Sequence, residues 1–210
     1  SRRIEPITEC LVLDKPLAAL LVVLPQWLKL LPVDIAIFEI ELVSADNAIA
    51  IALEASRRLK DDELTVIAKG IQSLSETSLQ LWWKVGKNGQ FRRLDEGAEQ
   101  LYLKLSGNLK FCFEPGQFIQ VNGDINTKMV DQMLRLVLPS SSGVAVDLFC
   151  GAGNLSLPLT KQFNQVIGVE GLDSLVAGAA KNALDNEITN AQFFTADLTK
   201  KNSLNQIKKT

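Results

Sequence analysis

The chain has 210 residues, of which 47% are hydrophobic and 22% charged, with 24 acidic against 22 basic side chains, three cysteines and no histidine. This composition is typical of a folded protein, and the length allows one large or two modest domains. The lack of histidine excludes Ser-His-Asp and Cys-His catalysis and histidine-ligated zinc. The three cysteines are scattered and form no CxxC pair, which favours a reducing, cytoplasmic location over a disulfide framework.

The first 110 residues are predicted to form an α+β domain built on an antiparallel sheet. An apolar stretch over 16–28 is too short to cross a bilayer and is expected to be a buried helix, with no membrane partner. Two runs with β-type patterning, 33–45 and 48–55, are separated by the hairpin-type pair Asp46-Asn47. Further along, the same kinds of pattern predict one helix and three strands, over 61–74, 79–85, 101–105 and 109–113.

From residue 111 onward the pattern changes to alternating buried strands and helices. This alternation is typical of parallel βαβ units, and it predicts domains at 1–110 and 111–210, the second of the Rossmann-like α/β class. The predicted elements are helices over 125–138 and 172–186, a helix after a glycine turn, and strands over 144–149, 165–170 and 191–197. A sheet with so few parallel strands leaves an apolar edge strand exposed. We therefore expect a truncated half-domain of a longer protein, and two copies of the chain could pair at this edge as a homodimer.

The strongest chemical signal is VAVDLFCGAGNLSLPL, residues 144–159. Gly151 and Gly153 follow the first parallel strand, where backbone amides and a helix N-terminus can meet a nucleotide. The G-x-G-x-x-G/A fingerprint of dinucleotide sites is only half met, because its third small-residue position is a serine. Asp147 and Asn154 add polar groups that could bind the amino and carboxylate groups of a ligand such as S-adenosylmethionine. NAD has no such amino-acid end, so S-adenosylmethionine fits better.

Two further acidic residues end the next strands. Glu170 ends the second strand, where a carboxylate accepts hydrogen bonds from ribose hydroxyls, and Asp197 ends the third, where an adenine amino group would lie. Either residue alone is as readily an ordinary surface acid. Together with Asp147, they place acids at three successive strand ends beside a glycine turn, which favours a ligand site at that edge.

Three segments resemble the RNA (uracil-5-)-methyltransferases, most closely the bacterial iron-sulfur enzymes that act on 23S ribosomal RNA. They are FEPGQFIQVNGDINTKMV, VDLFCGAGNLSLPL and VIGVEG. Without the resemblance, Gln120 would be taken as a surface amide and Phe149 as a core residue. The resemblance implies that S-adenosylmethionine is bound by Gln120, Phe149, Gly151, Gly153, Asn154, Glu170 and Asp197.

The resemblance also implies a mechanism. In that family the target uracil is first flipped out of its RNA. A cysteine thiolate then adds to C6 of the uracil, C5 takes the methyl group from S-adenosylmethionine, and a general base on the enzyme removes the C5 proton. The resemblance places the catalytic cysteine and the general base beyond residue 210, and it implies that Cys150 is a packing residue. We therefore expect no catalytic residue in this chain, which should be inactive by itself.

Cys10 resembles the last cysteine ligand of the family's [4Fe-4S] cluster. Four thiolates hold such a cluster, so we expect Cys10 to be the one metal-ligating residue here and the cluster to exist only in a full-length parent. A partly buried thiol without a metal is the alternative. Cys112 is expected to be a small buried hydrophobe.

The expected partner of the parent protein is 23S ribosomal RNA, although the sequence does not say which uridine. A net charge of −2 and a pI of about 5.3 argue against a broad phosphate-binding face. Arg57-Arg58, Arg92-Arg93 and one exposed ring of Trp82-Trp83 could make local contacts, but solvated charges are the simpler interpretation. The alternatives are a transfer-RNA uracil-5-methyltransferase, another S-adenosylmethionine methyltransferase, or a non-catalytic interaction module.

Overall fold

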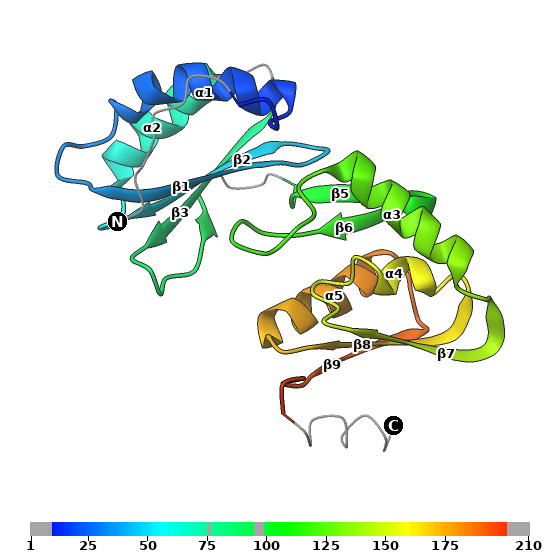
Figure 1. The fold of residues 1–210 in the computed structure, drawn as a ribbon. Coiled ribbons are helices and arrows are strands. Elements are labelled where there is room, and N and C mark those ends of the chain that lie inside the picture. The colour runs from blue at the N-terminus through cyan, green and yellow to red at the C-terminus, as the bar shows by residue number, and fades with distance from the viewer. Residues whose placement is uncertain (1–9, 75–76, 95–98, 201–210) are drawn as a thin grey trace. The chain divides into compact units, whose positions relative to one another are not determined.

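The computed structural model describes residues 10–74, 77–94 and 99–200 (Figure 1). The chain divides into two compact units. The first comprises Ser1–Leu101 and Glu114–Gly116, and the second comprises Tyr102–Phe113 and Gln117–Thr210. No helix in the described ranges is long and apolar enough to span a bilayer.

The first unit contains a four-stranded sheet in the order β1-β2-β3-β4. β1 (Ile37–Ser44) and β2 (Ile49–Ala55) pair antiparallel across the turn that holds Asp46-Asn47, as predicted. β3 (Leu79–Val85) runs parallel to β2, and the short β4 (Arg92–Arg93) pairs antiparallel with β3. The sheet is therefore mixed, because α2 (Asp61–Gln72) carries the chain back to the starting end before β3 begins.

Two helices cover one face of this sheet (Figure 1). α1 (Lys15–Leu28) begins at Asp14, whose carboxylate accepts a hydrogen bond from the amide of Leu17 at 2.9 Å. The indole nitrogen of Trp27 on α1 donates to the carbonyl of Ile67 on α2, at 3.3 Å. Both side chains are buried in the core that the helices form with β2, every residue of which is buried.

The paired tryptophans of β3 are both in the interior. Trp82 and Trp83 are 5% and 4% exposed. The expectation that one ring of the pair faces outward is therefore wrong. Adjacent residues of a strand point to opposite faces, and Trp83 belongs to the core formed with the two helices, so Trp82 is buried on the other face of the sheet.

The second unit contains a parallel sheet in the order β7-β8-β9, which confirms the α/β class. Its strands are β7 (Ser140–Leu148), β8 (Phe163–Glu170) and β9 (Ala191–Thr195). Its helices are α3 (Gly123–Leu136), α4 (Ser156–Leu159) and α5 (Asp173–Asp185). The helix after the glycine turn, α4, is only a single turn.

A hairpin of β5 (Tyr102–Leu105) and β6 (Leu109–Cys112), with a 3-10 turn at Ser106–Asn108, packs with α5. The side chain of Asn182 exchanges two hydrogen bonds with the backbone of Cys112, at 2.9 and 3.0 Å. Asn186, one helical turn later, does the same with Lys110, at 2.8 and 2.7 Å. The hairpin thus groups with the second compact unit, and the division into domains at residue 110 stays a prediction.

β7 forms one edge of the described sheet. Val144, Val146 and Leu148 alternate along it and are 51%, 52% and 47% exposed. The intervening Asp147 points toward α4, since it accepts a hydrogen bond from Ser156. The face of β7 opposite α4 is therefore apolar and uncovered among the residues that the structure describes.

Candidate functional site

The glycine turn connects β7 to α4 and has an unusual backbone. Phe149, Gly151 and Gly153 all have positive φ, at 60°, 56° and 100°. At Gly153, an added Cβ would lie 3.2 Å from Cγ of Leu157, so that both the dihedral angle and the packing favour glycine. Phe149 adopts this conformation, and the residue is 68% exposed rather than in the core.

Glu170, at the end of β8, fixes this turn. Its Oε2 accepts a hydrogen bond from the amide of Gly151 at 3.1 Å. Its Oε1 accepts from the amides of Gly171 and Leu172, at 2.7 and 3.2 Å. A carboxylate has about four acceptor positions, so three amides leave room for one more donor. Glu170 is half-buried, and it lies beside the glycine turn as the strand order predicts.

Two asparagines outside the predicted ligand set, Asn126 and Asn182, also hold the turn. The side-chain amide of Asn126 on α3 exchanges two hydrogen bonds of 2.9 Å with that of Asn154. The amide nitrogen of Asn182 on α5 donates to the carbonyl of Ala152 at 3.1 Å. Asn126 and Asn182 are 4% and 1% exposed. The available signal was a polar residue on the apolar face of each predicted helix, because buried amides require partners.

Asp147, near the end of β7, is partly buried, and Cys150, in the glycine turn, is buried. The carboxylate of Asp147 accepts a hydrogen bond of 2.6 Å from the hydroxyl of Ser156, and burial raises the pKa of Asp147. Burial, followed by the charges of Asp147 and Glu170, raises the pKa of the Cys150 thiol to about 12. A thiol with that pKa is protonated at neutral pH, so Cys150 is not an activated nucleophile in this conformation.

Among the proposed ligand contacts, Gln120 and Asp197 are the most distant in sequence from the glycine turn. Gln120 is exposed in the segment before α3, and its side chain forms no hydrogen bond within the described ranges. Asp197, after β9, accepts hydrogen bonds from the hydroxyl and amide of Thr199, at 2.6 and 3.1 Å, and pairs with Lys200 at 3.1 Å. The Thr199 hydroxyl, and then Lys200, lower the pKa of Asp197.

Cys10 lies just before α1 and is partly exposed. Between residues 10 and 200, apart from the two short gaps, no group of three or more His, Cys, Asp or Glu side chains could hold a metal ion. A [4Fe-4S] cluster takes four thiolates, and the whole sequence has three cysteines. The residues of this chain therefore do not make up a complete cluster site.

Comparison with known proteins identifies the family. A family model described as tRNA (Uracil-5-)-methyltransferase matches residues 13–206. The chain belongs to this family. The resemblance of the FIQVN and DLFCGAGN segments to RNA (uracil-5-)-methyltransferases is thereby confirmed.

Several similar relatives carry the name 23S rRNA (uracil(1939)-C(5))-methyltransferase RlmD. The protein of Pseudomonas fluorescens is 36% identical over 199 residues, which cover 95% of this chain and 42% of the relative. That of Vibrio vulnificus is 38% identical over 198 residues, which cover 94% of this chain and 44% of the relative. The chain thus spans less than half the length of these relatives.

A solved structure supports the fold. The tRNA (uracil-54, C5)-methyltransferase of Pyrococcus abyssi, crystallised with S-adenosyl-L-homocysteine, superposes with a TM-score of 0.72 at 17% sequence identity. The match covers 93% of this chain and 50% of that structure. The match therefore supports the fold of both units of this chain.

Proposed function

We propose that this protein uses S-adenosylmethionine to methylate C5 of a uridine in 23S ribosomal RNA. The observation that carries the proposal is the identity of 36–38% with RlmD proteins over nearly the whole chain. That region includes a glycine turn whose backbone amides are ordered by an acidic residue from the next strand. Because the chain spans only part of those relatives, the activity is proposed for the whole protein to which these residues belong.

The glycine turn is the proposed S-adenosylmethionine site. Glu170 is placed to accept a hydrogen bond from a ribose hydroxyl with its remaining acceptor position. The backbone of the turn and the amide of Asn154 would receive the amino-acid end, and the exposed ring of Phe149 would pack on the ligand. The full proposed set is Gln120, Phe149, Gly151, Gly153, Asn154, Glu170 and Asp197.

The proposed reaction needs a nucleophile that this turn does not provide. A thiolate adds to C6 of uracil, and the electrons of the C5–C6 double bond then attack the methyl group and release S-adenosylhomocysteine. Loss of the C5 proton to a base restores the double bond and expels the thiolate. Since Cys150 is held protonated, the role we assign to these 210 residues is to bind and orient the methyl donor. We expect no turnover from them alone.

Calorimetry with S-adenosylhomocysteine tests the site. Asn154→Ala and Glu170→Gln should each weaken binding about 10-fold, the loss expected for one hydrogen bond to a buried or charged group. Glu187→Gln is the matched control, because Glu187 is exposed beyond the end of α5 and outside the proposed set. Equal binding in all four proteins would refute the site. A folded wild type that does not bind the ligand would refute the proposed cofactor.

The choice of RNA is tested separately on the whole protein. Methyl transfer to unmodified 23S ribosomal RNA, with no transfer to tRNA, is the expected result, and the reverse preference would favour the transfer-RNA alternative. An RNA substrate of this kind implies a cytoplasmic protein.

We also propose Cys10 as one ligand of an iron-sulfur cluster in the whole protein. The iron bound by the whole protein should therefore fall after Cys10→Ser. Iron content that does not change would leave Cys10 as an ordinary thiol.

A further inference from the structure

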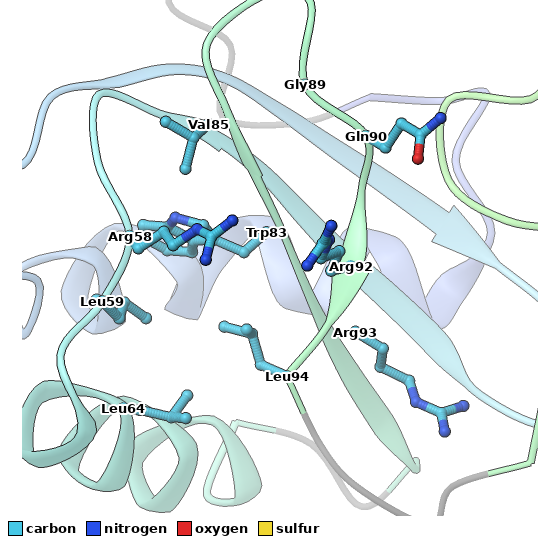
Figure 2. Close-up of a pocket in the computed structure, with 10 residues that line it drawn as sticks. All are labelled: Arg58, Leu59, Leu64, Trp83, Val85, Gly89, Gln90, Arg92, Arg93 and Leu94. Atoms are coloured by element: carbon cyan, nitrogen blue, oxygen red, sulfur yellow. The ribbon is translucent and has the colours of Figure 1, made fainter.

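The first compact unit contains a cavity of about 420 Å³ that is remote in sequence from the glycine turn (Figure 2). Its volume is within the range of small-molecule sites, about 300–1,000 Å³. Leucine, valine and tryptophan side chains form its apolar part, and three arginines lie around it. Among the residues that the structure describes, none of those lining the cavity is acidic; they are Arg58, Leu59, Leu64, Trp83, Val85, Gly89, Gln90, Arg92, Arg93 and Leu94.

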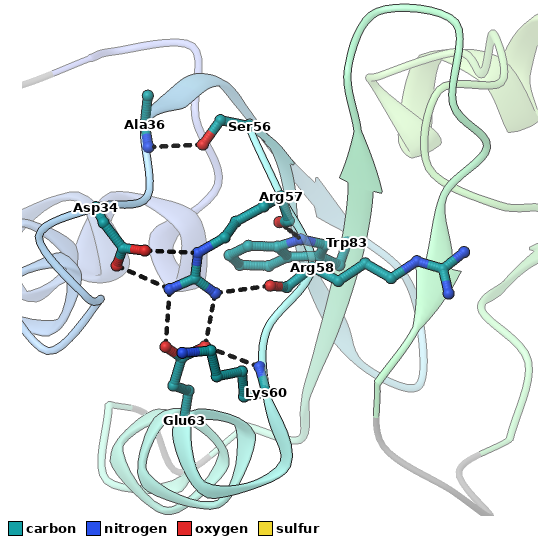
Figure 3. A network of polar contacts seen from close by, with 8 residues as sticks. All are labelled: Asp34, Ala36, Ser56, Arg57, Arg58, Lys60, Glu63 and Trp83. Atoms are coloured by element: carbon teal, nitrogen blue, oxygen red, sulfur yellow. Dashed lines mark hydrogen bonds and ion pairs between the residues drawn. The ribbon is translucent and has the colours of Figure 1, made fainter.

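Arg57 and Arg58 are adjacent in the chain but differ in their contacts (Figure 3). The guanidinium of Arg57 forms two hydrogen bonds of 2.8 Å with Asp34, two with Glu63, and one with the carbonyl of Arg58. The indole nitrogen of Trp83 donates to the carbonyl of Arg57 at 2.9 Å. Arg57 is therefore structural, and it fixes the backbone from which Arg58 projects into the cavity.

Two of the three arginines that line the cavity, Arg58 and Arg92, are not neutralised by any residue that the structure describes. The side chains of Arg58 and Arg92 are exposed and have no hydrogen-bond or ion-pair partner within the described part of the chain. Arg92 lies opposite Trp83 in the ladder between β3 and β4, so the sheet brings it to the same cavity as Arg58. Guanidinium groups without carboxylate partners are suited to phosphate, which they can bind through two hydrogen bonds.

The apolar part of the cavity narrows the choice of ligand. Inorganic phosphate would leave Leu59, Leu64 and Leu94 without a partner, whereas a nucleotide carries both a flat, largely apolar base and an anion. In a chain with net charge −2, a cavity whose described charged lining residues are all arginines is a local exception. We propose that this cavity binds one unstacked nucleotide of single-stranded RNA, with its base against the leucines and its phosphate on Arg58 and Arg92. The proposal rests on the proposed function in taking RNA as the ligand, and it adds an RNA contact in the first compact unit to the proposed methyl-donor site in the second.

Fluorescence anisotropy with a labelled single-stranded RNA of about 12 nucleotides tests the proposal. Arg58→Gln and Arg92→Gln should each weaken binding about fivefold at about 0.15 M salt, and each should lower the slope of log affinity against log salt by about one. Lys69→Gln makes the same charge change on the exposed part of α2, outside the cavity lining, and should bind as wild type does. Equal losses in all three variants would show a diffuse charge effect and overturn the proposal.

Three other ligands test the base and the class of partner. The same RNA with abasic sites and a duplex of equal length should bind less tightly, because neither offers an unstacked base. Equal binding of the abasic RNA would mean that only phosphate is recognised, contrary to the proposal. The affinity for a glutamate-rich peptide should be the same in wild type, Arg58→Gln and Arg92→Gln. If the peptide loses affinity in the two variants and RNA does not, the cavity is a protein-docking site and the proposal is wrong.

Calorimetry with S-adenosylhomocysteine on the same variants separates this proposal from the proposed function. Arg58→Gln and Arg92→Gln should bind that ligand as wild type does and unfold at the same temperature, since neither side chain has a partner to lose among the described residues. If S-adenosylhomocysteine binds but the two variants keep full RNA affinity, the cavity proposal fails alone. If the wild type does not bind S-adenosylhomocysteine while RNA binding shows the expected arginine dependence, the proposed function fails and the cavity proposal stands.

Discussion

The side-chain amides of Asn126 and Asn154 face each other and exchange two hydrogen bonds, each 2.9 Å long. The pair joins α3 to the glycine turn, although the two residues belong to different segments of the motif that resembles the family. The exchange uses one of the two N–H donors and one carbonyl lone pair of each amide, which fixes the orientation of the Asn154 side chain and leaves it a second N–H for a ligand. Asn126 is thus a positioning residue for a proposed ligand contact.

Replacing Asn126 with alanine should disturb both the fold and the proposed site. The change leaves the amide of Asn154 without its partner, which should lower the free energy of unfolding by about 1–3 kcal/mol. We also expect a loss of S-adenosylhomocysteine affinity of about 10-fold, measured by calorimetry under conditions where the variant is folded. Asn164→Ala, at an exposed position in β8, is the control and should change neither. Wild-type affinity in a destabilised Asn126→Ala protein would make the pair purely structural.

The glycines at 153 and 123 should respond in opposite ways to alanine. Gly153 has φ of 100° and its added Cβ would meet Leu157, so Gly153→Ala should cost about 1–3 kcal/mol and weaken ligand binding. Gly123 begins α3, where an added Cβ meets nothing within 4 Å, so Gly123→Ala should stabilise the protein by about 0.4–1 kcal/mol. Urea unfolding of both variants measures the contrast, and equal effects would contradict the conformational argument.

Acid should weaken the first unit through Glu63. Hydrogen bonds from Arg57, and then from the amide of Lys60, lower the pKa of Glu63 from its ordinary 4.5 to about 2. A carboxyl whose pKa is lower in the folded state stabilises the protein above its unfolded pKa, and this stabilisation is lost as the pH falls from about 5 to about 2. We expect the urea midpoint of wild type to fall in this interval more steeply than that of Glu63→Gln.

Asp62→Asn is a suitable control for this experiment. Asp62 is exposed in the same first turn of α2, so its removal changes the interaction with the helix dipole to a similar extent. Asp62→Asn should keep the steep acid dependence because the Arg57–Glu63 pair remains. If Glu63→Gln and wild type lose stability in parallel between pH 5 and pH 2, the ion pair does not contribute as described.

Cys150 should be unreactive toward alkylating reagents. At pH 8, a thiol with a pKa of about 12 has roughly 1,000-fold less thiolate than one with the ordinary value of 9.0, and Cys150 is also 5% exposed. Mass spectrometry after iodoacetamide treatment of the native protein should find Cys10, which is partly exposed, labelled well before Cys150. In urea the two should react at similar rates. Rapid labelling of native Cys150 would contradict its buried, protonated state.

Most of the secondary structure could be predicted from local patterns. The strand LQLWWKV was predicted over 79–85, where β3 lies, and the hairpin turn at Asp46-Asn47 is present. Such patterns are local because apolar periodicity and turn residues act within a few positions. The direction of β3 relative to β2 was not predictable in the same way, since it depends on where α2 returns the chain.

For the candidate site, the sequence indicated the turn but not the residues that support it. Gly151, Gly153 and Glu170 were selected because glycine turns and acidic strand ends have a known geometry in parallel sheets. Asn126 and Asn182 were not selected, because a polar residue in a helix has no partner until the helix is packed. The net charge of −2 argued against a broad RNA-binding face, and the sequence does not distinguish Arg57 from Arg58, which differ only in the residues that surround them.

The sequence by itself thus determined the family, the order of strands and helices along the chain, and the glycine turn with its acidic neighbour. These depend on short segments whose residue types have the same meaning in many folded contexts. Only the tertiary structure decided which arginine is bound by Asp34 and Glu63 and which is left to face a cavity. Pairing and burial join residues that are distant in the chain, and the free energy of a charge depends on those neighbours rather than on its position in the sequence.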